Sequence, residues 1–296
     1  MGMPYIRSII FLAIALISIS GCDNSPTTAT NTVPEIIRIA PLPDHAPELM
    51  RERYQPVVDY LAKQTGFKTE LIIADSYQNL LDLFHDGKID IANFGGVTFI
   101  KARKRDGAKP MVLRDIDTMF SSVVLVNNEI NAEGLQSLKG KSFAFGSKLS
   151  TSGHLMPRHF FSQQDIIPEE FFSRIEYSGA HDKTAYLVRD KKVSAGVANA
   201  GIIASMYSDG RINKSDIRVL WTSPTYADYV WAIQPTISNK IKKQLETAFL
   251  NLNSSVPEHK TVLDKLGANY YVTANNTDFF ELDVIFSRLT EEGIIK

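Results

Sequence analysis

Short apolar runs alternate with segments of helical periodicity along most of the chain. One helical stripe consists of Met50, Tyr54, Val57, Val58 and Leu61, and it stops before Gly66. The apolar runs have the length of buried strands and cover residues 36–40, 71–74, 89–92, 143–145, 175–177 and 195–198. Strands that alternate with helices predict parallel strand pairing and an α/β fold.

Two further apolar runs divide this alternation into halves. Residues 121–126 and 229–233 lie on either side of the second half, so they would carry the chain from one lobe to the other and back. Residues 240–252 and 279–289 again have helical periodicity and would complete the first lobe. We predict a mainly parallel sheet flanked by helices in each lobe, with a ligand in the cleft between them. The predicted lobes are 35–125 plus 229–296 for lobe one and 126–228 for lobe two.

The first residues have the pattern of an export signal. Arg7 precedes an apolar stretch that is too short for an ordinary membrane-spanning helix. Small residues then lead into Cys22, the only cysteine, in an order that resembles a bacterial lipobox. We expect residues 1–21 to be a signal peptide, Cys22 to be the lipidated N-terminus, and the polar residues 22–34 to be a flexible tether. The alternative is an uncleaved leader with an ordinary buried cysteine.

The residue after Cys22 gives an indication of where the protein is located in the cell. In lipoproteins of Gram-negative bacteria, an aspartate at this place, here Asp23, is associated with retention on the inner membrane. This resemblance implies a protein on the periplasmic face of the inner membrane, or on the extracellular membrane face in a Gram-positive organism.

Charge and cysteine content narrow the possible partners. The 32 Lys and Arg residues nearly balance the 33 Asp and Glu residues, so no net charge favours nucleic acid or an anionic surface. With Cys22 assigned to the anchor, we expect no disulfide and no cysteine-based metal site in the body. We also expect no cofactor.

The segment 146–157, which follows the apolar run at 142–145, contains the most specific chemical signal. Ser150, Thr151 and Ser152 stand where a helix is predicted to begin, with Gly153 after them. The first amides of a helix lack internal partners and carry the positive end of the helix dipole. Together with three hydroxyls they would form a seat for an oxyanion. An ordinary N-cap is the alternative, but a cap needs one such residue rather than three.

Residues at other predicted strand ends support a ligand site near this seat, because ligands of open parallel sheets bind outside the carboxyl ends of the strands. Tyr77 follows the second run, Phe94 and Gly95 follow the third, and His181 and Asn199 follow two later runs. The His181 ring could donate a hydrogen bond to an oxyanion. A purely structural role in the first turn of a helix also explains His181.

These residues resemble a known family, the phosphonate- and phosphite-binding lipoproteins of ABC importers, which belong to the two-lobed periplasmic binding proteins of type II. The resemblance covers nearly the whole body. Ser150–Gly153 with Pro157 is similar to the motif that binds phosphonate oxygens in the family. His181 and Tyr77 are similar to ligand-contacting residues of the family, and Asp228 lies in a segment similar to a crossover with an acidic residue near the ligand.

Two departures from the family pattern concern the ligand. Phe94 stands where aminophosphonate binders have a second tyrosine, and Asn199 stands where they have an acidic residue for the amine. A buried ammonium without a paired charge is costly. We therefore expect an amine-free oxyanion such as phosphite, phosphate or a short alkylphosphonate, and less readily 2-aminoethylphosphonate. Asp228 could accept a hydrogen bond from a protonated P–OH.

The resemblance implies a monomeric, non-enzymatic protein that captures its ligand with high affinity and delivers it to an ABC permease and its ATPase. A sensory lipoprotein that signals to a membrane kinase or cyclase is the alternative. A serine hydrolase is less favoured, because the chain around Ser150, Ser152, His154, His181 and Asp182 has no Gly-x-Ser-x-Gly elbow. Asp44, His45 and the basic run that starts at Lys101 receive no role in the site.

Overall fold

The computed structural model describes residues 1–2 and 35–295. Cys22, Asp23, nearly all of the predicted signal peptide and the predicted tether lie outside these residues, so the anchor stays a prediction. In the part of the chain that is described, no helix is both long and apolar enough to cross a membrane.

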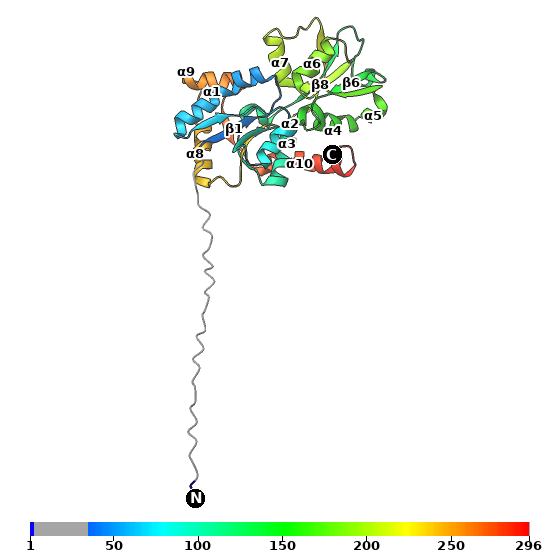
Figure 1. The fold of residues 1–296 in the computed structure, drawn as a ribbon. Coiled ribbons are helices and arrows are strands. Elements are labelled where there is room, and N and C mark those ends of the chain that lie inside the picture. The colour runs from blue at the N-terminus through cyan, green and yellow to red at the C-terminus, as the bar shows by residue number, and fades with distance from the viewer. Residues whose placement is uncertain (3–34, 296) are drawn as a thin grey trace. The chain divides into compact units, whose positions relative to one another are not determined.

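Two sheets organise the chain from residue 35 onward (Figure 1). The six-stranded sheet has the order β11-β4-β10-β3-β1-β2 and the five-stranded sheet the order β7-β6-β8-β5-β9. The first sheet contains β1 Ile37–Pro41, β2 Thr69–Leu71, β3 Ile91–Phe94, β4 Lys109–Arg114, β10 Val230–Ile233 and β11 Tyr271–Thr273. The second contains β5 Ser122–Asn127, β6 Ser142–Phe145, β7 Arg174–Tyr177, β8 Ala195–Asn199 and β9 Ile217–Thr222.

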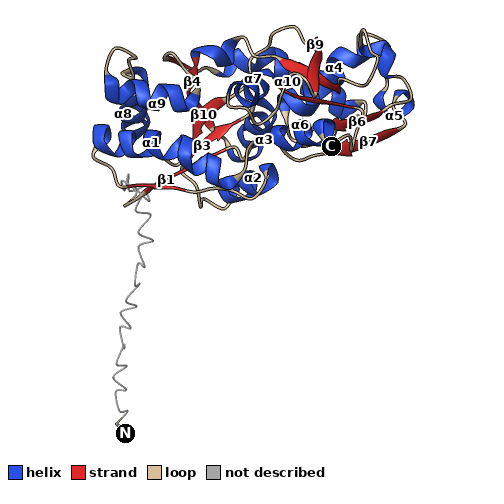
Figure 2. Ribbon diagram, turned by 90° about the horizontal axis from the view of Figure 1, so that it is seen from above, coloured by secondary structure: helices blue, strands red, loops and turns tan. Residues whose placement is uncertain are grey.

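Helices cover both faces of each sheet (Figure 2), and a hydrophobic cluster fills each of the four layers between sheet and helices. The six-stranded sheet packs against α1 Pro47–Thr65, α8 Asn239–Leu250 and α9 Pro257–Leu266 on one face, and against α2 Tyr77–His85, α3 Gly96–Asp106 and α10 Phe280–Glu291 on the other. The five-stranded sheet packs against α4 Met156–Ser162 and α5 Pro168–Phe171 on one face, and against α6 His181–Arg189 and α7 Ala200–Ser208 on the other. Shorter helical turns are η1 Asp115–Thr118, η2 Leu135–Leu138, η3 Thr151–Leu155 and η4 Asn276–Phe279.

The helical stripe predicted before Gly66 is confirmed. Helix α1 buries the predicted side chains and ends at Gly66, whose φ of 74° is the left-handed conformation that favours glycine.

The predicted α/β fold with two helix-flanked sheets is confirmed, and each sheet contains antiparallel pairs beside its parallel ones. Strands β1, β2 and β3 pair in parallel, as do β6, β7 and β8, but β10 and β5 run antiparallel to their neighbours. Strand β10 lies between β3 and β4, and β5 lies between β8 and β9. Both are the predicted crossing strands, which enter the sheet they join from the other sheet and so run against its parallel strands.

The predicted boundary at residue 125 also needs correction. It divides β5, yet Ser122 to Val126 all pair with β8 of the five-stranded sheet. The first crossing therefore precedes Ser122. It lies beside the return crossing, where Phe120 and Tyr226 form an isolated antiparallel bridge with N–H to O distances of 2.8 and 3.0 Å.

Gly196 on β8 allows α6 to pack closely against the five-stranded sheet. A Cβ atom there would lie 2.6 Å from Thr184 Cγ2 and 3.1 Å from the Ala144 carbonyl oxygen. Thr184 is fully buried and its hydroxyl is hydrogen-bonded to Ser178, so it has little freedom to move.

We expect Gly196→Ala to lower the free energy of unfolding by about 1–3 kcal/mol, measured by thermal and urea unfolding. Gly134→Ala, whose Cβ would meet no atom within 4 Å, is the control, and equal stability of the two variants would contradict the prediction.

Candidate ligand-binding site

The predicted hydroxyl seat lies at a helical start, as expected, but its first turn is π-helical. Ser150 is the N-cap: its Oγ accepts from the Gly153 N–H at 2.9 Å, and its carbonyl oxygen accepts from the Leu155 N–H at 3.0 Å. The π turn η3 continues directly into α4. Such turns inside helices recur at functional sites.

Gly153 allows two other segments to approach this turn. A Cβ there would lie 3.0 Å from Ser150 Oγ and 3.1 Å from both Gly146 Cα and His181 Cε1. The Gly146 N–H, at the end of β6, donates to the Gly153 carbonyl oxygen at 2.8 Å. The turn is therefore held against the sheet, with the His181 ring packed on it.

The hydrogen bonds of His181 determine which ring nitrogen carries the proton. Nδ1 lies 3.2 Å from the backbone nitrogen of Asn199 and accepts from that N–H, which leaves the proton on Nε2. Burial lowers the pKa of His181 to about 4, against the opposing charge of Asp44. At neutral pH His181 is therefore a neutral ring with a single N–H donor.

Of six buried side-chain polar atoms without a hydrogen-bond partner among the described residues, three belong to residues at the seat or at the predicted strand ends, and these three come from different elements. They are Tyr77 Oη at the start of α2, Ser152 Oγ in η3 and His181 Nε2 at the start of α6. The three residues are each at most 2% exposed. Burial raises the pKa of Tyr77 well above its ordinary value, so its phenol keeps its proton. Leaving a buried polar group unpaired costs about 1–3 kcal/mol, and a ligand with several acceptor atoms would remove that cost.

Thr151 differs from its two neighbours because it contacts the other sheet's elements directly. Its Oγ1 accepts from the Val97 N–H at 3.1 Å, and Asp228 Oδ1 accepts from the Gly96 N–H at 2.8 Å. Both amides belong to the first turn of α3. Gly95 is the N-cap of α3, and a Cβ there would meet Leu42 Cδ2 at 3.3 Å and Asp228 Oδ1 at 3.4 Å, so this N-cap lies in contact distance of Asp228.

Asp228 is a buried carboxyl group with a raised pKa. Burial raises its pKa to about 7, although hydrogen bonds from the Gly96 amide and the Thr151 hydroxyl lower it. The nearby charges of Asp117 and Arg114 act in opposite directions. Near neutral pH this group can therefore either donate or accept a proton.

Phe94 and Asn199 have packing roles that the sequence did not indicate. The Phe94 ring packs edge-on against Phe84 at 5.2 Å in the core between the sheet and α2. Its predicted place in the wall of the site stays a prediction. Asn199 caps α7 by accepting from the Ile202 N–H at 2.9 Å, and its amide nitrogen lies 3.4 Å from Tyr229 Oη.

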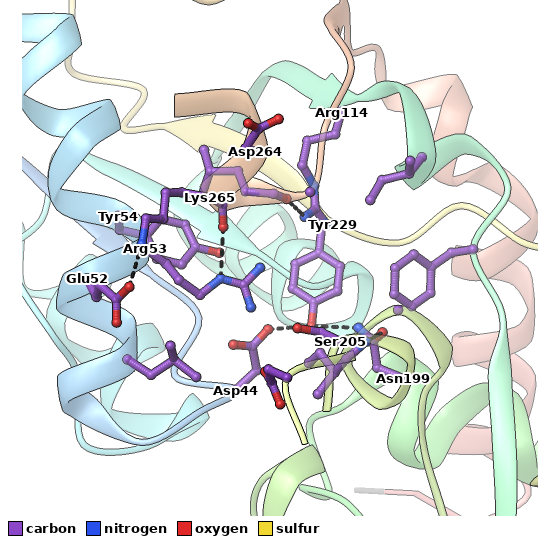
Figure 3. A pocket seen from close by; sticks show the side chains of 18 of the residues that line it. Asp44, Glu52, Arg53, Tyr54, Arg114, Asn199, Ser205, Tyr229, Asp264 and Lys265 are labelled. Carbon is purple, nitrogen blue, oxygen red and sulfur yellow. Dashed lines mark hydrogen bonds and ion pairs between the residues drawn. The ribbon is translucent and has the colours of Figure 1, made fainter. Parts of the chain in front are cut away.

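Sequence reasoning missed Asp44 and Tyr229. The Tyr229 hydroxyl donates to Asp44 Oδ2 at 2.8 Å, so Asn199, Tyr229 and Asp44 form a hydrogen-bonded row (Figure 3). This row lines a pocket of about 310 Å³ to which elements of both sheets contribute. Asp44 follows the carboxyl end of β1, so the strand-end rule applied to the other loops could have found it.

The contacts of the histidines do not favour a hydrolase or a metal centre. The His154 ring bonds to the Lys148 carbonyl oxygen through Nδ1 and accepts from Arg158 Nε through Nε2, so it is part of a structural network. Within residues 1–2 and 35–295, no group of three His, Cys, Asp or Glu side chains is placed to hold a metal ion.

Comparison with known proteins identifies the family of this chain. Residues 39–279 match the family model of the periplasmic substrate-binding protein of phosphonate ABC transporters. The probable ABC transporter phosphite-binding protein PhnD1 of Prochlorococcus marinus is 28% identical over 270 residues, which cover 87% of this chain and 91% of that protein. The phosphate-import protein PhnD of Mycolicibacterium smegmatis is 26% identical over 252 residues, or 80% of this chain and 78% of that protein. The solved structure of PhnD1 from Prochlorococcus marinus in complex with methylphosphonate matches with a TM-score of 0.83 at 26% identity, over 87% of this chain and 99% of that chain.

The raised pKa of Asp228 predicts a pH dependence of stability. The folded state holds the proton more tightly than the unfolded state, in which an aspartate has a pKa of about 3.9. The contribution of Asp228 to stability is therefore complete below about pH 4 and is lost as the pH rises to about 7.

We expect Asp228→Asn to reduce the fall in melting temperature between pH 5 and pH 8, because asparagine can still accept from the Gly96 amide but does not ionise. Thermal unfolding across this range measures the effect. Asp59→Asn, on an exposed part of α1, should leave the fall unchanged. A fall in Asp228→Asn as large as in the parent protein would contradict the assignment.

Proposed function

Since this chain belongs to the family of periplasmic substrate-binding proteins of phosphonate ABC transporters, we propose that it captures a small phosphorus oxyanion and delivers it to an ABC permease and its ATPase. The proposed ligands are phosphite, phosphate and short alkylphosphonates. The relatives are named for phosphite and phosphate, and the related structure holds methylphosphonate. The observation that carries the proposal is the set of three buried donors, Tyr77, Ser152 and His181, whose polar atoms have no hydrogen-bond partner of good geometry among the described residues. The Ser150 side chain still influences the pKa of Tyr77, and the Ser152 side chain that of Tyr226, so both hydroxyls lie near these tyrosines.

These donors suit a phosphorus oxyanion because each is neutral and each can give one hydrogen bond. Oxyanion oxygens accept such bonds strongly when the donors are buried, since no water competes there. The free amides at the start of η3 add the positive end of a helix dipole. Asp228 would accept from a P–OH group and so favour a ligand that keeps a proton.

Ligand capture is coupled to lobe closure in this proposal. We assign lobe one to the six-stranded sheet with its helices and lobe two to the five-stranded sheet with its helices. Tyr77 belongs to lobe one, whereas Ser152 and His181 belong to lobe two, so a single ligand would bond to both. A ligand that binds the closed form better shifts the population toward it, and the transporter would recognise that form.

The proposal needs neither a chemical step nor a cofactor. The relatives are transport proteins, and the chain would act as a monomer. A lipid on Cys22 would hold it at the periplasmic face of the inner membrane, with residues 22–34 as the tether.

Removing the Ser152 hydroxyl tests whether the hydroxyl seat binds the ligand. We expect Ser152→Ala to weaken binding about ten- to a hundredfold, because a hydrogen bond to a charged group is worth about 1.5–3 kcal/mol. Calorimetric titration with phosphite, methylphosphonate, phosphate and sulfate measures the affinities after bound ligand has been stripped. Ser162→Ala, exposed at the end of α4, is the control. Unchanged affinity in Ser152→Ala would remove this residue from the site, and no binding of any phosphorus ligand by the parent protein would refute the proposed function.

Thr151 tests lobe closure, because its hydroxyl accepts a hydrogen bond from the Val97 amide of lobe one. Thr151→Val keeps the volume but leaves the Val97 N–H without its acceptor in the closed form, at a cost of about 1–3 kcal/mol. We expect small-angle scattering to show that the variant closes only at roughly tenfold or more higher ligand concentration. Thr151→Ser keeps the hydroxyl and should behave like the parent protein. Closure at the same ligand concentration in Thr151→Val would contradict the coupling.

A further inference from the structure

The carbonyl oxygen of Ser152 lacks a partner in its own helix, because the residue that would supply one is a proline. In a π turn a carbonyl pairs with the N–H five residues further on, as the Thr151 carbonyl does with the Met156 N–H. The residue five positions after Ser152 is Pro157, which has no N–H. The Ser152 carbonyl therefore needs a donor from another part of the protein.

The Ser122 hydroxyl, at the first residue of β5, is that donor. Its Oγ lies 2.8 Å from the Ser152 carbonyl oxygen and 2.6 Å from Tyr226 Oη. A hydroxyl has one proton and a carbonyl has none, so Ser122 donates to Ser152, and Tyr226 must donate to Ser122. Burial raises the pKa of Tyr226 well above its ordinary value, so the phenol keeps the proton that it donates.

The peptide group between Ser152 and Gly153 is held at both of its polar atoms. Its carbonyl oxygen accepts from Ser122, and its N–H donates to Ser150 Oγ at 2.9 Å. Because a peptide group is planar, these two bonds fix its orientation and with it the direction in which the Ser152 side chain leaves the backbone. Ser122 is fully buried and Ser152 is 1% exposed, so water does not compete for these bonds.

The outer two hydroxyls of this row belong to the segments that cross between the sheets. Ser122 follows the first crossing, and Tyr226 lies in the return crossing, where its backbone forms the isolated bridge to Phe120. The Ser122 N–H donates to Ser223 Oγ at 2.9 Å, and its carbonyl oxygen accepts from the Ser223 N–H at 2.9 Å. The orientation of Ser152 therefore depends on both crossing segments.

We propose that Ser122 and Tyr226 are positioning residues, which hold the Ser152 peptide group in the geometry that binds the oxyanion without contacting the ligand themselves. The inference rests on the proposed function, because the orientation of Ser152 matters only if its hydroxyl binds a ligand. A donor that is already oriented has less freedom to lose on binding. Removing the hydroxyls behind Ser152 should therefore weaken binding, although neither hydroxyl belongs to the seat.

Three variants test this row by calorimetric titration of the purified full-length protein in detergent with phosphite and methylphosphonate. Ser122→Ala removes the donor to Ser152, so we expect roughly tenfold weaker binding. Tyr226→Phe keeps that bond but removes the donor behind it, so the loss should be about threefold. Ser122→Thr keeps the hydroxyl and should bind like the parent protein.

Leu138→Ala separates positioning from stability. Leu138 is fully buried in the core of lobe two and precedes β6, whereas the seat follows the other end of that strand. Its truncation should lower the melting temperature and leave the affinity unchanged at a temperature at which every variant is folded. If Ser122→Ala does not fold, Tyr226→Phe decides the outcome, because it changes only one hydroxyl.

Parent-like affinity in Ser122→Ala, or in Tyr226→Phe where the alanine variant does not fold, would overturn the positioning role. A loss in Ser122→Thr or in Leu138→Ala as large as in Ser122→Ala would also overturn it, because the hydroxyl would not be the cause. These results refute only the positioning role, since they require that the parent protein binds. If the parent protein binds neither phosphite nor methylphosphonate, the proposed function is refuted and the positioning role with it.

Discussion

The first turn of α3 has amides without helical acceptors, and the way they are satisfied determines how the two lobes meet. The Gly96 amide donates to Asp228, in the return crossing, and the Val97 amide donates to Thr151, in lobe two. Gly96 packs this turn closely on both sides, since a Cβ there would collide with Leu282 Cδ2 of α10 and would lie 3.2 Å from Thr151 Oγ1. A general requirement of helix ends, that their amides find acceptors, is thus met across the interface between the lobes.

Neutral groups dominate the chemistry around the proposed ligand. The candidate donors are a phenol, a hydroxyl and an uncharged imidazole, whereas the arginines nearby are paired with carboxylates or carbonyl oxygens. Recognition by neutral dipoles, as proposed for this site, would suit a protein that releases its ligand, because no buried ion pair would have to be broken.

The two segments that cross between the sheets are hydrogen-bonded to the hydroxyl seat. The Ser122 hydroxyl donates to the Ser152 carbonyl oxygen at 2.8 Å and lies 2.6 Å from Tyr226 Oη. Tyr226 in turn forms the isolated bridge to Phe120. The hydroxyl seat is therefore attached to the two segments about which the lobes would move.

Local pattern in the sequence was enough to predict the alternation of strands and helices, the two crossing strands, and the hydroxyl turn at a helix start, because each depends on residues close together in the chain. The mixed pairing of β5 and β10 was not predictable, since strand direction depends on which sheet a strand joins. The hydrogen bond from Val97 to Thr151, the tautomer of His181 and the hydrogen bond from Tyr229 to Asp44 depend on partners from distant parts of the sequence. Only the tertiary structure decided these, because hydrogen bonding and burial depend on which distant residues become neighbours.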